Sequence, residues 1–216
     1  MTKNVSFLID GFNLYHSLDT LGKMTGASVK WLNLMGLCEG YLQAVRGGLG
    51  ERVELAQVHY FSALAEHLVP RNPEVVERHR AYIRALTESG VKVQLSHFKR
   101  RDVRCPGCGK RFVRYEEKET DVAIGLKLVE VFATRESQTA VLVTGDTDMI
   151  PAISAARRLF PDHKIGVGFP FLRHNRELAQ HADYSFKIDQ RSLLKSQFPP
   201  RVRLRDGSEI VRPAGW

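Results

Sequence analysis

The stretch Thr139–Ile153, TAVLVTGDTDMIPAI, decides the fold. It starts with an apolar run, Ala140–Val143, that is rich in β-branched residues and stops at Thr144 and Gly145. This pattern predicts a buried strand that ends in a tight turn. Apolar residues at helical spacing follow the turn, so a helix is expected directly after it.

Two acidic residues, Asp146 and Asp148, stand where this strand gives way to the helix. In open α/β sheets, ligands bind just beyond the carboxyl ends of the strands. Two carboxylates at such a place repel each other unless they are protonated, hydrogen-bonded or bridged by a cation. The structural alternative is that one carboxylate caps the helix N-terminus while the other is solvated, because Asp is a favoured cap.

Predicted strands and helices alternate along the rest of the chain. Strands are expected at 5–9, 54–63, 91–97, 140–143, 164–168 and 184–188. Helices are expected at 14–21, 31–45, 74–88, 120–134 and 177–181, and the helix after the turn at Thr144 and Gly145 is expected to run through Leu159. This alternation predicts an α/β fold, a three-layer sandwich with a mostly parallel central sheet and helices on both faces. We expect one domain over 1–189, with a loop at 22–30 and an irregular basic insert at 99–118, and a basic, Pro-interrupted extension outside the core at 190–216.

The composition favours a polyanionic partner. The chain has 32 Lys and Arg against 24 Asp and Glu, a net charge of +8, which points first to nucleic acid and second to an anionic membrane surface. No run is apolar and long enough to span a membrane. The short apolar run near the N-terminus ends at Asp10, which predicts a first strand rather than a signal peptide. Three Cys suit a reducing compartment, so a cytoplasmic protein is expected.

Two further acidic residues stand at matching places. Asp10 ends the first predicted strand, and Asp121 opens the helix predicted at 120–134. If the two strands are neighbours, Asp10 converges with Asp146 and Asp148 at one edge of the sheet, and a helix N-terminus can bring Asp121 to them. Clustered carboxylates supply hard oxygen ligands for Mg²⁺ or Mn²⁺. Such an ion can activate water and offset the charge that builds on a phosphodiester. The structural alternatives are a turn residue at Asp10 and a helix-cap partner of Thr120 at Asp121.

Four motifs, in this order, carry a resemblance to a known family. They are VSFLIDGFNLYHSL (5–18), EEKETDVAIGLKLVEVF (116–132), VLVTGDTDMIPAI (141–153) and HNRELAQHADYSFKI (174–188). Together they resemble the NYN domain, a branch of the PIN-like nuclease superfamily, and particularly its bacterial LabA-like members. The resemblance runs from about Asn4 to Asp189. GDTDM departs mildly from the usual GDSDF.

The resemblance implies a catalytic site. In that family, the acidic residues matching Asp10, Asp121, Asp146 and Asp148 form a divalent-metal site for RNA cleavage, and the polar residue matching Asn13 lies beside it. A metal-dependent ribonuclease that acts on single-stranded RNA is therefore expected, with one or two Mg²⁺ or Mn²⁺. The alternative is a nucleic-acid-binding or regulatory adaptor without turnover. A phosphatase on a similar sheet is a third possibility, although IDGFN lacks the second Asp of the haloacid-dehalogenase type.

Other polar residues are candidates for supporting roles. Thr144 could hydrogen-bond a carboxylate or a metal-bound water, or be an ordinary strand-end Thr. Lys118 could contact a phosphate, or be a solvated lysine. A basic stretch with interleaved aromatics could grip the backbone and stack bases, or be a solvated loop. It contains Arg100, Arg101, Arg104, Lys110, Arg111 and Arg114, with Phe98, Phe112 and Tyr115.

Cys105 and Cys108, in CPGCGK, form a knuckle of the type that binds Zn²⁺. A structural site needs four ligands. His97, Cys38 or His59 could supply the others through the fold, or two chains of a homodimer could pool their pairs. The alternative is a β-turn with two free thiols. A redox role is disfavoured because no strand leads into the pair as in thioredoxin-like motifs.

Overall fold

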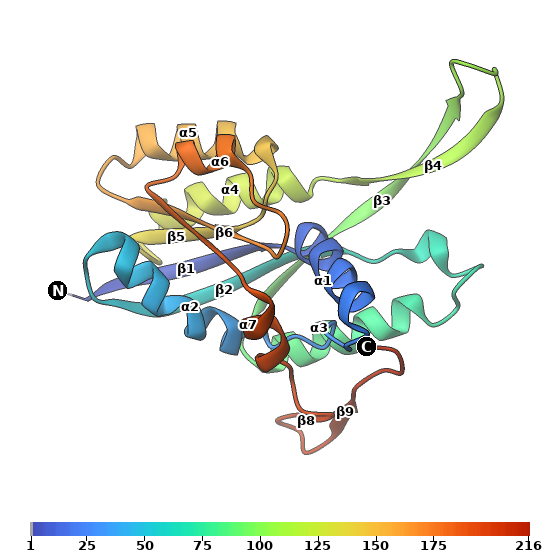
Figure 1. Cartoon of the computed structure of the whole chain (residues 1–216), viewed down its shortest axis with the longest axis horizontal. Coiled ribbons are helices and arrows are strands. Elements are labelled where there is room, and N and C mark those ends of the chain that lie inside the picture. The colour runs from blue at the N-terminus through green and yellow to red at the C-terminus, as the bar shows by residue number, and fades with distance from the viewer. Residues whose placement is uncertain (1) are drawn as a thin grey trace.

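The computed structural model describes residues 2–216 and has a seven-stranded central sheet with the order β4-β3-β2-β1-β5-β6-β7 (Figure 1). The strands are β1 (Lys3–Asp10), β2 (Val53–Ala63), β3 (Lys92–Arg104), β4 (Arg111–Lys118), β5 (Thr139–Val143), β6 (Lys164–Phe169) and β7 (Tyr184–Lys187). Neighbouring strands run parallel except for the antiparallel pair of β3 and β4. The predicted α/β fold with a mostly parallel sheet is confirmed.

Helices cover both faces of this sheet (Figure 1). They are α1 (Gly11–Thr25), α2 (Leu34–Leu49), α3 (Val75–Glu88), α4 (Thr120–Ala133), α5 (Ile150–Leu159), α6 (Arg176–His181) and α7 (Gln190–Lys195), with the 3₁₀ turns η1 (Glu66–Leu68) and η2 (Thr147–Met149). Helices α4, α5 and α6 lie on one face, and α1, α2, α3 and α7 on the other. Among residues 2–216, no helix is long and apolar enough to cross a membrane.

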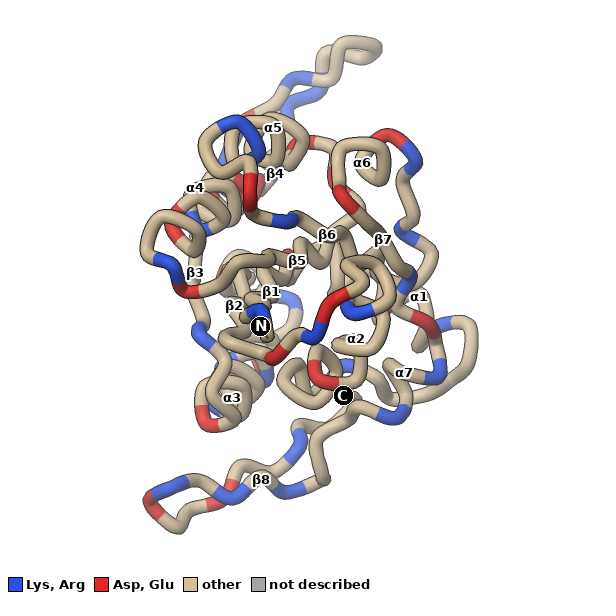
Figure 2. The backbone as a smooth tube through the Cα atoms, turned by 90° about the vertical axis from the view of Figure 1, so that its left-hand side faces the viewer, with Lys and Arg blue, Asp and Glu red and all other residues tan. Residues whose placement is uncertain are grey.

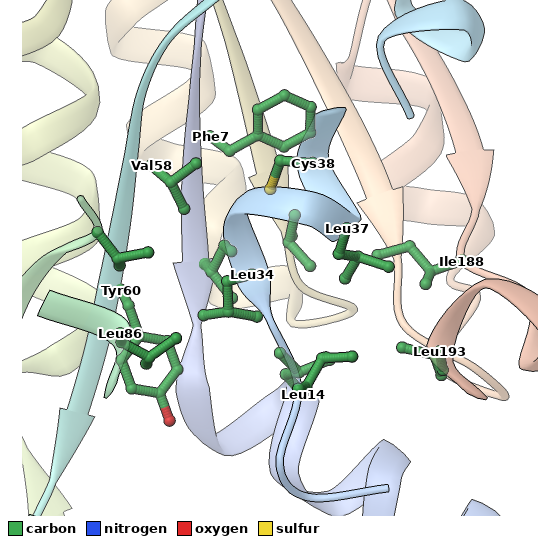
Figure 3. Packing of buried hydrophobic residues seen from close by; sticks show 14 of the residues in the cluster. Phe7, Leu14, Leu34, Leu37, Cys38, Val58, Tyr60, Leu86, Ile188 and Leu193 are labelled. Atoms are coloured by element: carbon green, nitrogen blue, oxygen red, sulfur yellow. The ribbon is translucent and has the colours of Figure 1, made fainter. Parts of the chain in front are cut away.

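Strand β1 lies in the middle of the sheet and contributes to both cores. Phe7 and Ile9 belong to the core beneath α1, α2 and α3, whereas Leu8 belongs to the core beneath α4 and α5. Successive side chains of a strand point to opposite faces, so a central strand with both faces covered carries apolar side chains on each of them. Figure 3 shows Phe7 beside Cys38 of α2 in the first of these cores.

The ends of the first two helices differ from the prediction. Helix α1 continues into the expected loop and ends at Gly26, which has a φ of 70° and donates its amide to the carbonyl of Gly22. Helix α2 starts after Asn33, which caps it, and continues beyond the predicted end at residue 45, through Gly47 and Gly48. Gly50, with a φ of 69°, ends α2 instead. Left-handed glycine is the usual helix terminator, and the sequence does not show which glycine takes that conformation.

The basic insert at 99–118 is regular, contrary to expectation. Strands β3 and β4 pair from His97 with Lys118 to Arg104 with Arg111. We call residues 97–118 the arm, because this hairpin projects from the body beyond the carboxyl ends of the other strands (Figure 1). Its side chains are mostly exposed, so the sequence lacks the apolar alternation by which a half-buried strand is recognised.

The C-terminal segment 190–216 was expected to lie outside the core, but several of its residues are buried in it. Leu193, Phe198 and Ile210 are buried in the same core as α1 and α2. Trp31 donates a 2.9 Å hydrogen bond from Nε1 to the carbonyl of Pro199. Isolated apolar residues among Arg and Pro hide this packing in the sequence. A small hairpin of β8 (Arg201–Arg203) and β9 (Glu209–Val211), to which Ile210 belongs, carries exposed basic residues, as does the arm (Figure 2). The division at 189/190 stays a prediction.

Candidate active site

The carboxylate of Asp10 lies at the junction of β1, α1 and β5. Asp10 is the last residue of β1 and the N-cap of α1, and its Oδ1 accepts a 2.9 Å hydrogen bond from the amide of Asn13. Its Oδ2 accepts a 2.9 Å bond from Oγ1 of Thr144, which directly follows β5. The same hydroxyl oxygen accepts a 3.1 Å bond from the amide of Asp146. Because β1 and β5 are neighbours in the sheet, residues 134 positions apart share one buried network.

Two glycines allow this close approach. A Cβ at Gly11 would lie 2.4 Å from the carbonyl oxygen of Phe61 in β2, and one at Gly145 would lie 2.2 Å from the carbonyl oxygen of Arg173. Gly145 also donates its amide to Oδ1 of Asn13 at 3.1 Å. Asn13 therefore holds the turn after β5 against the start of α1. Asn13, the polar residue that the resemblance placed beside the catalytic site, therefore makes a structural contact with Gly145.

Asp146 and Asp148 show the capping arrangement that the sequence left open. Asp146 caps η2, and its Oδ1 accepts a 3.0 Å bond from the amide of Asp148. The side chain of Asp148 is exposed. Capping by one oxygen is compatible with a second role, because a carboxylate has four lone-pair sites.

Asp121, in the first turn of α4, is brought close to the other carboxylates. Its pKa is raised to about 6, first by burial and then by the negative charges of Asp10, Asp146, Glu117 and Asp148. The pKa of Asp10 is also raised, mainly by burial, although the bonds from Asn13 and Thr144 oppose the shift. The four predicted Asp residues thus gather at the carboxyl edge of the sheet.

Glu117 is a member of this acidic group that the sequence analysis missed. Its Oε1 accepts hydrogen bonds from the amide and the hydroxyl of Thr120, so Glu117 is the cap partner of Thr120 in place of Asp121. Three acidic residues precede Asp121 in EEKETD, but only the fold shows which of them accepts the hydrogen bonds from Thr120.

The acidic side chains do not converge on a common point. Within the part of the chain that the structure describes, no three His, Cys, Asp or Glu side chains are placed so that one metal ion could be held by all of them. The fold brings the carboxylates to one edge of the sheet without arranging them as a shared ligand set.

The predicted basic residues lie on the arm. Lys118, at its base, forms a 3.0 Å ion pair with Glu116, which also contacts Arg101 at 3.3 Å. Arg100 pairs with Asp102 at 3.1 Å. The other predicted residues of the set are Arg104, Lys110, Arg111 and Arg114, in or next to the outer half of the arm. The arm is a positively charged projection beside the acidic site.

Aromatic side chains connect the base of the arm to the acidic site. Phe12, two residues after Asp10, contacts Phe98 edge-on with ring centres 5.5 Å apart. Phe98 lies 4.5 Å from the ring of His67, and His67 is stacked on Tyr115 at 4.4 Å with an interplanar angle of 13°. We call Phe12, Phe98, His67 and Tyr115 the aromatic row. The sequence indicated Phe98 and Tyr115, but Phe12 and His67 join them only through the fold.

Cys105 and Cys108 lie in the turn at the tip of the arm. Backbone N–H of Cys108, the Cys108 thiol and backbone N–H of Gly107 lower the pKa of the Cys105 thiol. The three other candidate zinc ligands lie away from the tip of the arm. Cys38 is buried in the core (Figure 3), His59 bonds to Glu136 at 2.9 Å, and His97 is at the opposite end of the arm. Within residues 2–216 of one chain, these residues therefore close no four-ligand zinc site.

Comparison with known proteins places the chain in a family. The family model described as NYN domain matches residues 4–189, from β1 to just beyond β7. The chain belongs to the NYN domain family. The NYN domain is part of the PIN-like nuclease superfamily, so the resemblance in the four motifs is confirmed at this level. Membership of the LabA-like branch stays a prediction.

Two individual proteins are similar to this NYN domain. One, from Pseudomonas putida (strain DSM 28022 / S16), is named 6-hydroxy-3-succinoylpyridine 3-monooxygenase HspA. It is 27% identical over an alignment of 237 positions that covers 96% of this chain and 73% of the relative. The other is the crystal structure of a protein of unknown function from Vibrio parahaemolyticus. It superposes with a TM-score of 0.53 at 18% identity, covering 88% of this chain and 94% of the other, and supports the fold alone.

Proposed function

We propose that this NYN domain is a metal-dependent ribonuclease that hydrolyses phosphodiester bonds in single-stranded RNA. The observation that carries the proposal is the gathering of Asp10, Asp146 and Asp148 near Asp121, whose pKa is raised first by burial and then by their negative charges. Mutually repelling carboxylates are costly unless a proton or a cation compensates them. Their position at the carboxyl ends of β1 and β5 is where open α/β sheets bind ligands.

The donor set fits Mg²⁺ or Mn²⁺. Asp10, Asp121, Asp146 and Asp148 offer only hard carboxylate oxygens, which these ions prefer. Asp10 is fixed by two hydrogen bonds, whereas Asp148 is exposed and its side chain is free to rotate toward Asp10. When bound, the ion supplies Lewis acidity that activates water and offsets the charge developing on the phosphate.

The chain's own residues fix the geometry of this chemistry. Thr144 and Asn13 hold Asp10 in one orientation, so this carboxylate needs no reorganisation when substrate arrives. Gly145, held by Asn13 and packed under Arg173, positions the turn that carries Asp146. Hydrolysis by attack of water on phosphorus then proceeds without a covalent enzyme intermediate.

The arm and the aromatic row favour single-stranded RNA as the substrate. Lys and Arg side chains bind the phosphate backbone without sequence preference. Aromatic rings stack with unpaired bases, and Phe12 places the end of the aromatic row beside the acidic site. A base on Phe98 or Phe12 would leave its phosphate near Asp10. The free thiols of the three Cys suit the reducing cytoplasm, which is the proposed location.

Cleavage of end-labelled RNA tests this proposal. Purified protein is incubated with single-stranded RNA, matched single-stranded DNA and double-stranded RNA, each with Mn²⁺, Mg²⁺ or EDTA. We expect metal-dependent cutting of single-stranded RNA that is lost in Asp146→Asn and kept in Asp162→Asn, an exposed carboxylate before β6. Cutting in EDTA, or undiminished cutting by Asp146→Asn, contradicts the proposal.

An adaptor that binds RNA without cutting it is the second candidate. It is favoured by the absence, in residues 2–216, of three acidic, His or Cys side chains set around one ion position. The same experiment separates the two, because RNA bound in EDTA and left intact in Mn²⁺ supports the adaptor.

The name of the Pseudomonas relative supplies a candidate from another class. That protein is named as a monooxygenase of 6-hydroxy-3-succinoylpyridine, and the alignment covers 96% of this chain. Incubation with that compound, O₂ and a reduced nicotinamide or flavin, followed by mass spectrometry, tests it. An oxygenated product would favour this candidate over the ribonuclease.

A further inference from the structure

We propose that Cys105 and Cys108 are half of a tetrahedral zinc site, and that the other half is the same pair from a second copy of this chain. The site would join two chains at the tips of their arms. The proposal is independent of the ribonuclease activity, because it concerns residues at the far end of the arm from the acidic site.

The turn at the tip is built to present two sulfur ligands. It is closed by two 2.9 Å backbone bonds, from the amide of Cys105 to the carbonyl of Lys110 and from the amide of Gly109 to the carbonyl of Cys105. Gly109 has a φ of 70°, a conformation that glycine adopts without strain. Cys105 and Cys108 stand three positions apart in this closed turn, which is the C-x-x-C spacing at which one zinc ion takes two ligands.

The remaining two ligands have to come from outside the chain. The sequence contains one other cysteine, Cys38, which is 2% exposed in the core of α2. The nearest histidine along the chain, His97, pairs with Lys118 at the opposite end of the arm. A closed structural zinc site has four protein ligands, so one chain supplies half of it.

A second copy fits this place in shape and in charge. The arm projects from the body, so two tips can meet while the bodies stay apart (Figure 1). Each tip carries Arg104, Lys110 and Arg111. Arg104 donates to the carbonyl of Gly109 at 3.2 Å, which places its charge beside the cysteines. Four thiolates outweigh the charge of one zinc ion, and the surrounding cations offset the excess. Without zinc, the two basic tips repel each other, so pairing requires the metal.

Zinc content and molecular mass test this proposal. The full chain, without a histidine tag, is purified under reducing conditions with equimolar Zn²⁺, and zinc per chain and mass in solution are measured before and after chelation. We expect one zinc for every two chains in a dimer that chelation returns to monomers. Bound Co²⁺ should show the absorption of a tetrahedral tetrathiolate site.

The double variant Cys105→Ser/Cys108→Ser should be monomeric and zinc-free, with an unchanged circular dichroism spectrum because the tip is exposed. Cys38→Ala is the matched control and should keep both zinc and dimer. A monomer with one zinc, a chain with free thiols that takes up no zinc, or a dimer that survives in the double variant overturns the proposal.

Discussion

Thr144 donates a 2.9 Å hydrogen bond from Oγ1 to Oδ2 of Asp10, and both side chains are buried. This bond joins the ends of the neighbouring strands β1 and β5. It also opposes the rise in the pKa of Asp10 that burial causes. A single hydroxyl therefore supports both the fold and the charge state of the most buried predicted ligand.

Thr144→Val should destabilise the protein, because it leaves a buried carboxylate without one of its donors. We expect a loss of about 1.5–3 kcal/mol in the free energy of unfolding at neutral pH. The variant raises the folded-state pKa of Asp10 further, so its deficit should shrink as the pH falls through that pKa and the carboxyl becomes protonated. Urea unfolding at several pH values measures this. Thr144→Ser keeps the hydroxyl and should lose only about 0.8 kcal/mol for the methyl group. Equal losses in both variants would contradict this account.

Asp121→Asn should stabilise the protein at neutral pH without added metal. The folded-state pKa of Asp121 is about 6, above its ordinary value of 3.8, so the charged form costs stability above pH 6 and the cost disappears as the pH falls toward 4. The wild type should therefore gain stability on acidification through this window, by roughly 1 kcal/mol after allowance for the partial exposure of Asp121. Asp121→Asn should lack this gain. Thermal melts in EDTA from pH 8 to pH 4.5 test it, and an identical pH dependence in both proteins would count against the crowding.

Gly11→Ala should be strongly destabilising, because the new Cβ would lie 2.4 Å from a backbone oxygen that a rotamer change cannot move. Overpacking of this kind costs about 1–3 kcal/mol or more. Gly40→Ala is the matched control at an exposed position of α2, where nothing lies within 4 Å of the new Cβ, and it should stabilise the protein by about 0.5–1 kcal/mol. Melting temperatures that move in opposite directions support the close contact of α1 with β2.

Phe98→Ala should weaken binding of single-stranded RNA, because it removes the middle of the aromatic row. Loss of one stacking partner costs about 1–3 kcal/mol of binding free energy. Phe112→Ala is the control, an exposed aromatic at the outer end of the arm that lies outside the row. Fluorescence anisotropy with labelled RNA in EDTA, at fixed salt, compares them. An equal effect of both variants would argue that the arm binds RNA without the row.

The sequence predicted the parallel sheet and the clustering of the carboxylates because both follow from local patterns. Apolar runs that end in Asp10 and in the turn before Asp146 show where the strands stop, and parallel strands end at the same edge. Asp121 was expected to join them because it opens the helix predicted at 120–134, and the fold brings it to the same place.

What the sequence could not show depends on contacts between distant residues. The arm has no apolar face, so its strands lack the usual alternation. His67 joins Phe98 and Tyr115 only because η1 folds against the base of the arm. The burial of Phe198 likewise depends on Trp31, far away in the chain. In each case tertiary packing, rather than local preference, decides the outcome.

The most direct test of the central claim is the position of Mn²⁺ in crystals, measured from anomalous scattering at the manganese edge. We expect a peak bonded to Asp10 and Asp146, with Asp121 or Asp148 rotated toward it, and loss of that peak in Asp146→Asn. A crystal equilibrated with Mn²⁺ at neutral pH that shows no peak among these carboxylates, or an undiminished peak in the variant, would contradict it.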